Sequence, residues 1–173
     1  MKRHSRSVWK GLAAGAVGGL VGTIVMTEYQ NAITRVKKAA RKNGDGHPPR
    51  QEQKKEDPAT VKAAQAIARS VSGKSISDER KEIAGQVVHY AMGIVSGAVY
   101  GMLTERARTR RPATGLLFGT GVWAIADEVA VPALKLSDMP WKYPASIHAN
   151  ALAAHLVYGG TTWAVARGIR ASL

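Results

Sequence analysis

Four long, nearly uncharged runs interrupt this basic chain of 173 residues, and they limit the folds open to it more than any other feature. They cover about residues 11–28, 83–104, 113–134 and 147–166. Each run approaches the roughly 20 residues with which a helix crosses the hydrocarbon core of a bilayer. Apolar runs separated by basic blocks are the alternation that membrane insertion requires. We therefore predict an all-α fold in which residues 1–173 form one integral membrane domain, a bundle of four transmembrane helices.

Glycines recur at four-residue spacing inside three of these runs. Such spacing places small residues on one helix face, where two backbones can approach closely in lipid. In a water-exposed helix each glycine would cost roughly 1 kcal/mol relative to alanine, which counts against the alternative of a soluble, alanine-rich protein that binds nucleic acid. These faces outnumber the contacts that one small bundle needs, so we expect a homo-oligomer or a subunit of a larger membrane complex. The expected packing residues are Gly11, Gly15, Gly18, Gly19, Gly22, Gly93, Gly97, Gly101, Gly115 and Gly119.

The chain carries a formal net charge of +13, and the charge lies in blocks between the apolar runs. Attraction to anionic lipid headgroups explains the blocks at 35–42 and 106–111. Aromatic residues do not interleave with them, so we expect no specific nucleic-acid partner. The absence of cysteine excludes disulfides, thiolate metal ligands and cysteine nucleophiles. No phosphate-binding loop or nucleophile elbow is present, and the sequence favours a protein that is not an enzyme.

The main hydrophilic stretch covers residues 30–82. Its centre, residues 42–57, is rich in Gly, Pro and charge and predicts a basic, flexible linker. Asp57-Pro58 then has the pattern of a helix start, and Ser72-Gly73 the pattern of a helix end. Because apolar residues recur on one face between these points, we predict a short amphipathic helix on the bilayer surface or against the bundle.

Ionisable residues inside or beside the four runs form a predicted polar cluster. Burying such a group in a bilayer costs a few kcal/mol, so these side chains should face the bundle interior or the interface. In an up-and-down bundle their helix ends meet on the side opposite the termini. His148 and His155 are two helical turns apart on one face, with His155 roughly 10 Å deeper. The cluster comprises Glu28, His89, Asp127, Glu128, His148 and His155.

Three interpretations of this cluster remain open. The carboxylates and histidines can act as structural contacts between helices. They can form a path for protons or ions, for which His, Asp and Glu are the usual groups in membranes. They can also bind a divalent metal, although no cofactor is required by the sequence. In that case His89, Glu128, His148 and His155 are the candidate ligands of a metal-dependent membrane enzyme.

Three prolines stiffen the connection between the third and fourth runs. Pro132, Pro140 and Pro144 bracket a segment that also carries Trp141 and Tyr143. Aromatic residues of this kind are typical of membrane–water interfaces. The segment is therefore expected to be an interfacial anchor, with a lid over the polar cluster or a docking surface as the alternatives.

The run VPALKLSDMPWKYPASIHANALAAHLVYG, residues 131–159, resembles the YagU-like family of bacterial inner-membrane proteins. The resemblance rests on the span ending at Pro132, the Pro140-Trp141 pair and His155-Leu156-Val157, and it covers roughly the last hundred residues. It implies a multi-span helical protein of the bacterial inner membrane and no particular reaction. A link to acid tolerance, suggested for some members, would suit a proton-responsive histidine cluster. Of the cluster, His155 alone falls on a matching motif.

Overall fold

The computed structural model describes residues 2–43, 57–109 and 111–172, and the regular elements within these ranges are all helical. The centre of the predicted linker lies outside the described residues. The elements in chain order are α1 (Lys2–Asn43), α2 (Ala59–Ser72), α3 (Asp78–Ala107), α4 (Pro112–Trp123), the π-helix η1 (Ala124–Ala130), α5 (Val131–Ala133), the 3₁₀ turn η2 (Pro140–Lys142) and α6 (Ala145–Ser172).

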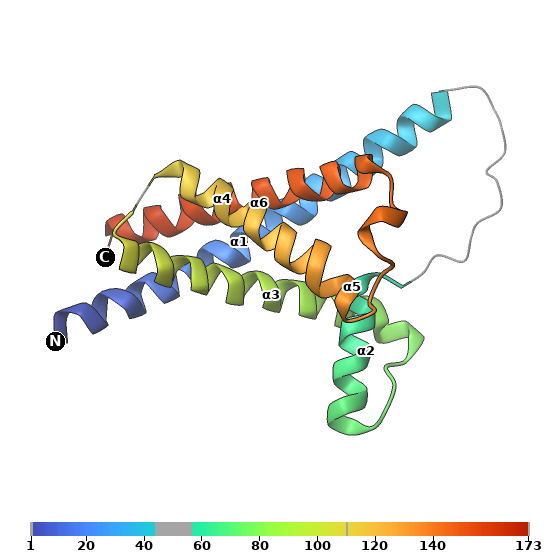
Figure 1. Ribbon diagram of the computed structural model, residues 1–173, viewed down its shortest axis with the longest axis horizontal. Coiled ribbons are helices and arrows are strands. Elements are labelled where there is room, and N and C mark those ends of the chain that lie inside the picture. Colours follow the sequence, from blue (N-terminus) through green and yellow to red (C-terminus); the bar gives the residue numbers. More distant parts are fainter. Residues whose placement is uncertain (1, 44–56, 110, 173) are drawn as a thin grey trace.

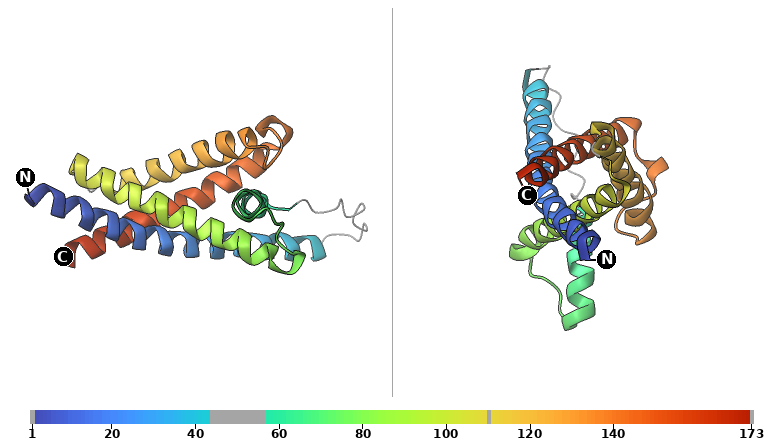
Figure 2. Two further views of the ribbon diagram at one scale, coloured as in Figure 1. Left: turned by 90° about the horizontal axis from the view of Figure 1, so that it is seen from below. Right: turned by 90° about the vertical axis from the view of Figure 1, so that its left-hand side faces the viewer.

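The long helices alternate in direction along the chain (Figure 1). Both ends of the chain and the connection from α3 to α4 lie at one end of the bundle, which we call the terminal end. The last turns of α1, helix α2 and the connection from α5 to α6 lie at the other end, which we call the loop end (Figures 1 and 2). The helices are closest near the middle of α1 and spread apart toward the loop end, as Figure 2 shows.

Glycines bring α1 and α3 into backbone contact. A Cβ atom added to Gly15 would meet the carbonyl oxygen of Gly97 and would lie 2.9 Å from the Cα of Gly101. Gly19 likewise faces Gly93, and Gly11 faces Gly101. Side chains on either helix would push the two backbones apart, so this antiparallel interface exists only because both faces lack Cβ atoms.

Glycines also bring α1 and α4 close to the backbone of α6. A Cβ on Gly18 of α1 would lie 2.7 Å from the carbonyl oxygen of Thr162, and Gly115 of α4 faces Gly159 in the same way. The remaining glycines of the expected set, Gly22 and Gly119, face Tyr158 and His155 on α6. Every glycine in the set thus faces a neighbouring helix of the same chain. The glycine faces are therefore used within one copy and no longer argue for an oligomer.

Three of the four predicted spans form helices that are long and apolar enough to cross a membrane: Val8–Ala40 within α1, Asp78–Ala107, and the continuous Pro112–Ala133. The prediction of a fourth such helix is wrong. Residues 147–166 lie in α6, which is long enough but is not among the helices of sufficient apolarity in the described part of the chain. Helix α6 is less apolar because it packs against both α1 and α4 and buries polar residues such as His155 and Thr162 there.

The first loop differs from the sequence prediction at its start. Helix α1 continues well beyond Glu28 to Asn43, through residues that the sequence analysis assigned to the hydrophilic stretch. These residues are rich in Ala, Lys and Arg, which favour a helix, and contain no Gly or Pro. Helix α2 follows Pro58, ends at Gly73 with a left-handed φ of 68°, and packs Val61 and Ala64 against α3.

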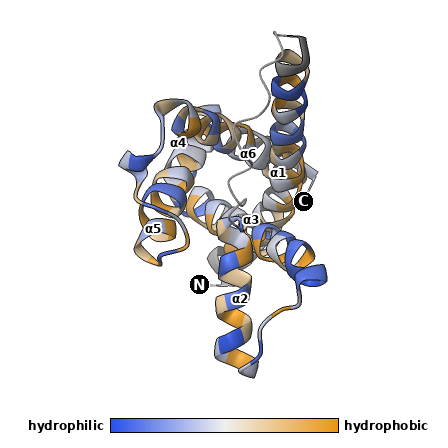
Figure 3. Ribbon diagram, turned by 90° about the vertical axis from the view of Figure 1, so that its right-hand side faces the viewer, coloured by the Kyte–Doolittle hydropathy of each residue, from blue (hydrophilic) through white to orange (hydrophobic). Residues whose placement is uncertain are grey.

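Apolar side chains cover much of the outer surface of the bundle. Exposed Val, Leu, Ile and Met residues occur along α1, α3 and α4, among them Val95 and Leu117. Hydrophilic colour gathers at the loop-end turns of α1 and along one side of α2 in Figure 3. An apolar surface of this extent on the outside of a helical bundle is typical of contact with lipid or with a partner.

Candidate functional site

A π-helical segment positions both carboxylates of the site. Asp127 and Glu128 lie in η1, where the backbone N–H of Val131 bonds to the carbonyl of Ala126, five residues back. Pro132 follows immediately; it has no N–H, and its ring would clash with the carbonyl four residues before it in a regular α-helix. The widened turn places two consecutive acidic side chains toward α6. Single π-turns inside helices are frequent at functional sites.

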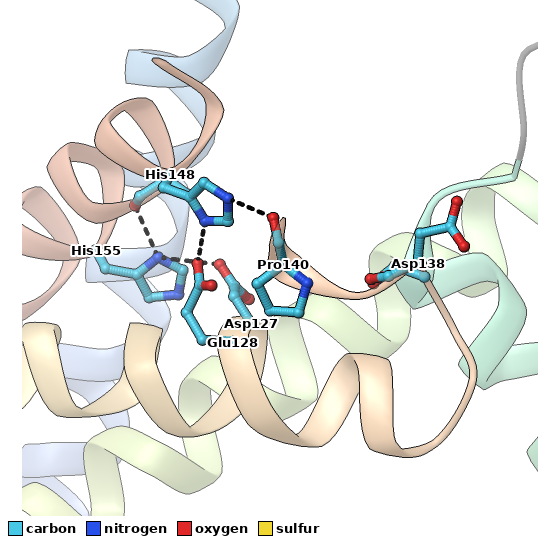
Figure 4. A network of polar contacts seen from close by, with 8 residues as sticks. Asp127, Glu128, Asp138, Pro140, His148 and His155 are labelled. Atoms are coloured by element: carbon cyan, nitrogen blue, oxygen red, sulfur yellow. Dashed lines mark hydrogen bonds and ion pairs between the residues drawn. The ribbon is translucent and has the colours of Figure 1, made fainter. Parts of the chain in front are cut away.

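His148 links three elements at the loop end of the bundle (Figure 4). Its Nδ1 lies 2.6 Å from Oε1 of Glu128 on η1, and its Nε2 lies 3.0 Å from the carbonyl oxygen of Pro140 on η2. The ionised carboxylate of Glu128 and the backbone carbonyl of Pro140 both accept hydrogen bonds, and neither can donate one. A neutral imidazole has one N–H and can satisfy one of them, whereas an imidazolium satisfies both. The geometry therefore selects the protonated ring, paired with the Glu128 carboxylate; we call this arrangement the His148 latch.

The pKa of His148 is raised above its ordinary value, chiefly because Glu128 accepts a hydrogen bond from the ring and also because the Pro140 carbonyl does. A raised pKa in the folded protein means that the latch is fully formed below the ordinary histidine pKa of about 6.5 and is lost as the pH rises through the raised value. Tyr143 also faces the ring edge-on at a centroid distance of 6.5 Å.

The loop that carries Pro140 is braced internally. Lys142 pairs with Asp138 at 2.8 Å, and the backbone N–H of Asp138 donates to the Tyr143 hydroxyl at 3.2 Å. The pKa of Lys142 is raised by the Asp138 carboxylate that accepts its hydrogen bond. The loop is thus a preformed unit, and the side chain of His148 joins its Pro140 carbonyl to η1 and α6.

A second histidine–carboxylate pair lies deeper. His155 is 8% exposed, and its Nδ1 lies 3.6 Å from Oδ2 of Asp127 and 2.9 Å from the carbonyl of Ala151 (Figure 4). Because that carbonyl can only accept, Nδ1 carries the hydrogen. Asp127 therefore sits between the outer pair and the interior, at a distance from His155 that allows electrostatic attraction without a direct hydrogen bond.

The other two members of the predicted cluster lie apart from these pairs. His89 on α3 is half-buried, stacks edge-on against Tyr90 and lies within electrostatic reach of His155. Glu28 is exposed on α1, and no hydrogen bond or ion pair joins it to the cluster among the described residues. The site therefore consists of His148–Glu128 and Asp127–His155, with His89 beside the inner pair.

The geometry does not bring the candidate metal ligands together. Within residues 2–43, 57–109 and 111–172, no group of three or more His, Cys, Asp or Glu is placed to hold a metal ion. Glu128 and His148 bond to each other instead, and His155 turns its Nδ1 to the backbone of its own helix. The donor set therefore does not fit a metal centre.

Sequence reasoning missed two features of the site. It did not identify the Pro140 carbonyl as a partner of His148, since no side-chain pattern marks a backbone acceptor. It also missed Gly159, the α6 glycine against which Gly115 and Gly119 of α4 pack. The Gly159-Gly160 pair in the fourth run was a usable signal for such a close contact.

Comparison with family models matches residues 35–164, about three quarters of the chain, to a family described as a protein of unknown function, DUF1440. The matched range contains α2 to α5, most of α6 and all residues of the two histidine–carboxylate pairs, while most of α1 precedes it. Comparisons with curated proteins and with solved structures gave no match. By the extent of the family match, the chain belongs to the DUF1440 family.

Proposed function

We propose that the chain is a non-enzymatic membrane component that handles protons through the His148 latch and the inner Asp127–His155 pair. Three helices suited to spanning a membrane and an apolar outer surface support the membrane assignment. The resemblance to YagU-like proteins adds the bacterial inner membrane as the location, with anionic headgroups around the basic ends.

The observation that carries the proposal is the placement of one imidazole between two acceptors. A purely structural contact would need one hydrogen bond, and a neutral histidine would provide it. Here there are two acceptors, and the ring donates to the Glu128 carboxylate and to the Pro140 carbonyl at the same time only when it is protonated. Proton binding at His148 is thereby tied to the position of the loop 134–144.

The Asp127–His155 pair extends the effect of proton binding at His148 into the bundle. Asp127 and Glu128 are adjacent in η1, so loss of the proton from His148 leaves an unpaired carboxylate next to Asp127. Asp127 in turn faces the imidazole of His155, with His89 behind it. The four groups form a short chain from the loop end toward the interior, which is the composition expected of a proton relay in a membrane.

Glu128→Gln is expected to lower the pKa of His148 toward the ordinary histidine value, because an uncharged amide no longer favours the imidazolium. The measurement is a pH titration of ¹⁵N-histidine resonances in detergent-solubilised full-length protein. Asp138→Asn serves as the matched control: it also removes one carboxylate near the loop end, but that carboxylate pairs with Lys142. An unchanged His148 titration in Glu128→Gln would show that the pair does not set its protonation.

Proton flux separates proton handling from a structural contact. Liposomes that contain the protein and an internal pH dye are given a pH step, and the proposal expects a flux that is lost in His148→Leu and in Asp127→Asn. Equal flux in protein-free liposomes and in liposomes with the native chain would leave the cluster with a structural role alone.

A further inference from the structure

A pocket of about 350 Å³ lies at the terminal end of the bundle, away from both histidine–carboxylate pairs. It is enclosed by α1, α3, the turn after α3 and the last turns of α6, and we call it the arginine pocket. Its size falls in the range of small-molecule sites. The lining residues that matter here are Glu105, Arg108, Thr109, Trp163, Arg167 and Arg170.

Three arginines and one carboxylate line the arginine pocket. Arg170 donates to the Glu105 carboxylate, and the side chains of this pair are 16% and 15% exposed. Among the lining residues that the structure describes, Glu105 is the one carboxylate, and its pairing with Arg170 leaves the charges of Arg108 and Arg167 in excess. The pocket therefore presents net positive charge.

The fold positions the guanidinium of Arg167 and the backbone of Arg108. The guanidinium of Arg167 lies 5.5 Å from the ring centroid of Trp163, a cation–π contact. Arg108 occupies the left-handed position that ends α3, with φ of 50°, and its backbone N–H caps the Glu105 carbonyl. Beside them the backbone N–H of Thr109 bonds to Thr104, which closes the rim of the pocket.

We propose that the arginine pocket binds the phosphate group of an anionic ligand, above all the headgroup of an anionic phospholipid. Guanidinium groups match phosphate geometry with paired hydrogen bonds. Basic pockets between membrane helices are known receptors for such headgroups. The position at the ends of α3 and α6, with the indole of Trp163 in the wall, places the pocket where the apolar outer surface gives way to the charged end of the bundle. This inference rests on the membrane assignment proposed above and is independent of proton handling.

The test uses the full chain in mild detergent and native mass spectrometry with added lipid. Phosphatidylglycerol is expected to bind with one preferred molecule per chain, and zwitterionic phosphatidylcholine is expected to bind at least about tenfold more weakly, a difference of one decade in Kd. Equal binding of the two lipids would overturn the proposal.

The variant Arg108→Gln/Arg167→Gln is expected to weaken phosphatidylglycerol binding about tenfold or more. The control, Arg80→Gln/Arg106→Gln, removes the same charge from exposed arginines outside the pocket and should change the affinity less than about twofold. Arg108 and Arg167 are both exposed, so the double variant should still fold. Thermal unfolding checks this, and the two single variants replace the double variant if it does not fold. Equal losses in the pocket and control variants would reduce the binding to diffuse charge and contradict the assignment.

Competition with inorganic phosphate shows whether the pocket takes a lipid headgroup or free phosphate. If millimolar phosphate leaves phosphatidylglycerol bound, the lipid headgroup is the ligand, as we expect from the position of the pocket. If phosphate displaces the lipid from the native chain and from Arg80→Gln/Arg106→Gln alike, the same phosphate site takes the soluble anion.

Discussion

Gly159→Ala is expected to destabilise the bundle by about 1–3 kcal/mol or more, whereas Gly160→Ala should be neutral or stabilising by up to about 1 kcal/mol. A Cβ on Gly159 would collide with the carbonyl of Gly115 and would lie 2.9 Å from the Cα of Gly119, both backbone atoms of α4. A Cβ on Gly160 would meet only the Cδ2 of Leu116, at 3.8 Å. Backbone cannot move aside as a flexible side chain can, so the whole α4–α6 interface must open.

The neighbouring glycines form a matched pair, since both substitutions add one methyl group to the same turn of α6. Reversible unfolding in mixed micelles, followed by circular dichroism, measures both free energies. Because α4 continues into η1, Gly159→Ala should also shift the His148 resonances, and Gly160→Ala should not. If the two variants lost equal stability, α4 and α6 would not be in backbone contact.

Tyr158→Ala is expected to cost about 3–5 kcal/mol of unfolding free energy, in line with removal of a buried aromatic side chain. Tyr158 is 3% exposed, packs with Met26 and Ala154, and donates a 2.7 Å hydrogen bond to the carbonyl of Gly93 on α3. One side chain of α6 thus contacts α1 and α3 together. Its removal leaves a cavity at the centre of the bundle.

Tyr158→Phe separates packing from hydrogen bonding. It keeps the ring and loses the hydroxyl, so it should cost about 0.5–1.5 kcal/mol, the range of side-chain hydrogen bonds between membrane helices. The same unfolding measurement applies to both variants. A cost for Tyr158→Phe as large as that for Tyr158→Ala would mean that the hydrogen bond, and not the packing of the ring, joins α6 to α3.

Local periodicity carried much of the sequence prediction. Four-residue glycine spacing marks helix faces, and the structure places those faces against neighbouring helices. The spacing of His148 and His155 places both on one side of α6, where each meets an η1 carboxylate. The buried face of α1 runs through Gly22 and Met26, and Glu28 is exposed outside it. Helical periodicity continued past Gly22 would therefore have excluded Glu28 from the polar cluster.

Other features depend on contacts that no local pattern encodes. Pro132 signals a break in a helix, but the sequence pattern does not say that the break takes the form of a π-turn at Asp127 and Glu128. Hydropathy assumes that a spanning helix faces lipid, and α6 breaks this assumption by burying its polar residues between α1 and α4. The ion pair of Glu105 and Arg170 joins residues far apart in sequence and could be found only in three dimensions.

The most direct test of the His148 latch is a distance measurement across it. The chain contains no cysteine, so spin labels can be placed on Met139→Cys in the loop and on Leu117→Cys, an exposed position on α4. Leu103→Cys with Leu117→Cys provides a control pair outside the loop, expected to be independent of pH. Electron–electron double resonance should give a narrow loop–α4 distribution below the raised His148 pKa and a broad one above it. In His148→Leu the distribution should be broad at every pH. If the distance distribution between loop and α4 in the native chain stayed unchanged from about pH 5 to about pH 9, on both sides of the histidine range, the His148 latch would be contradicted.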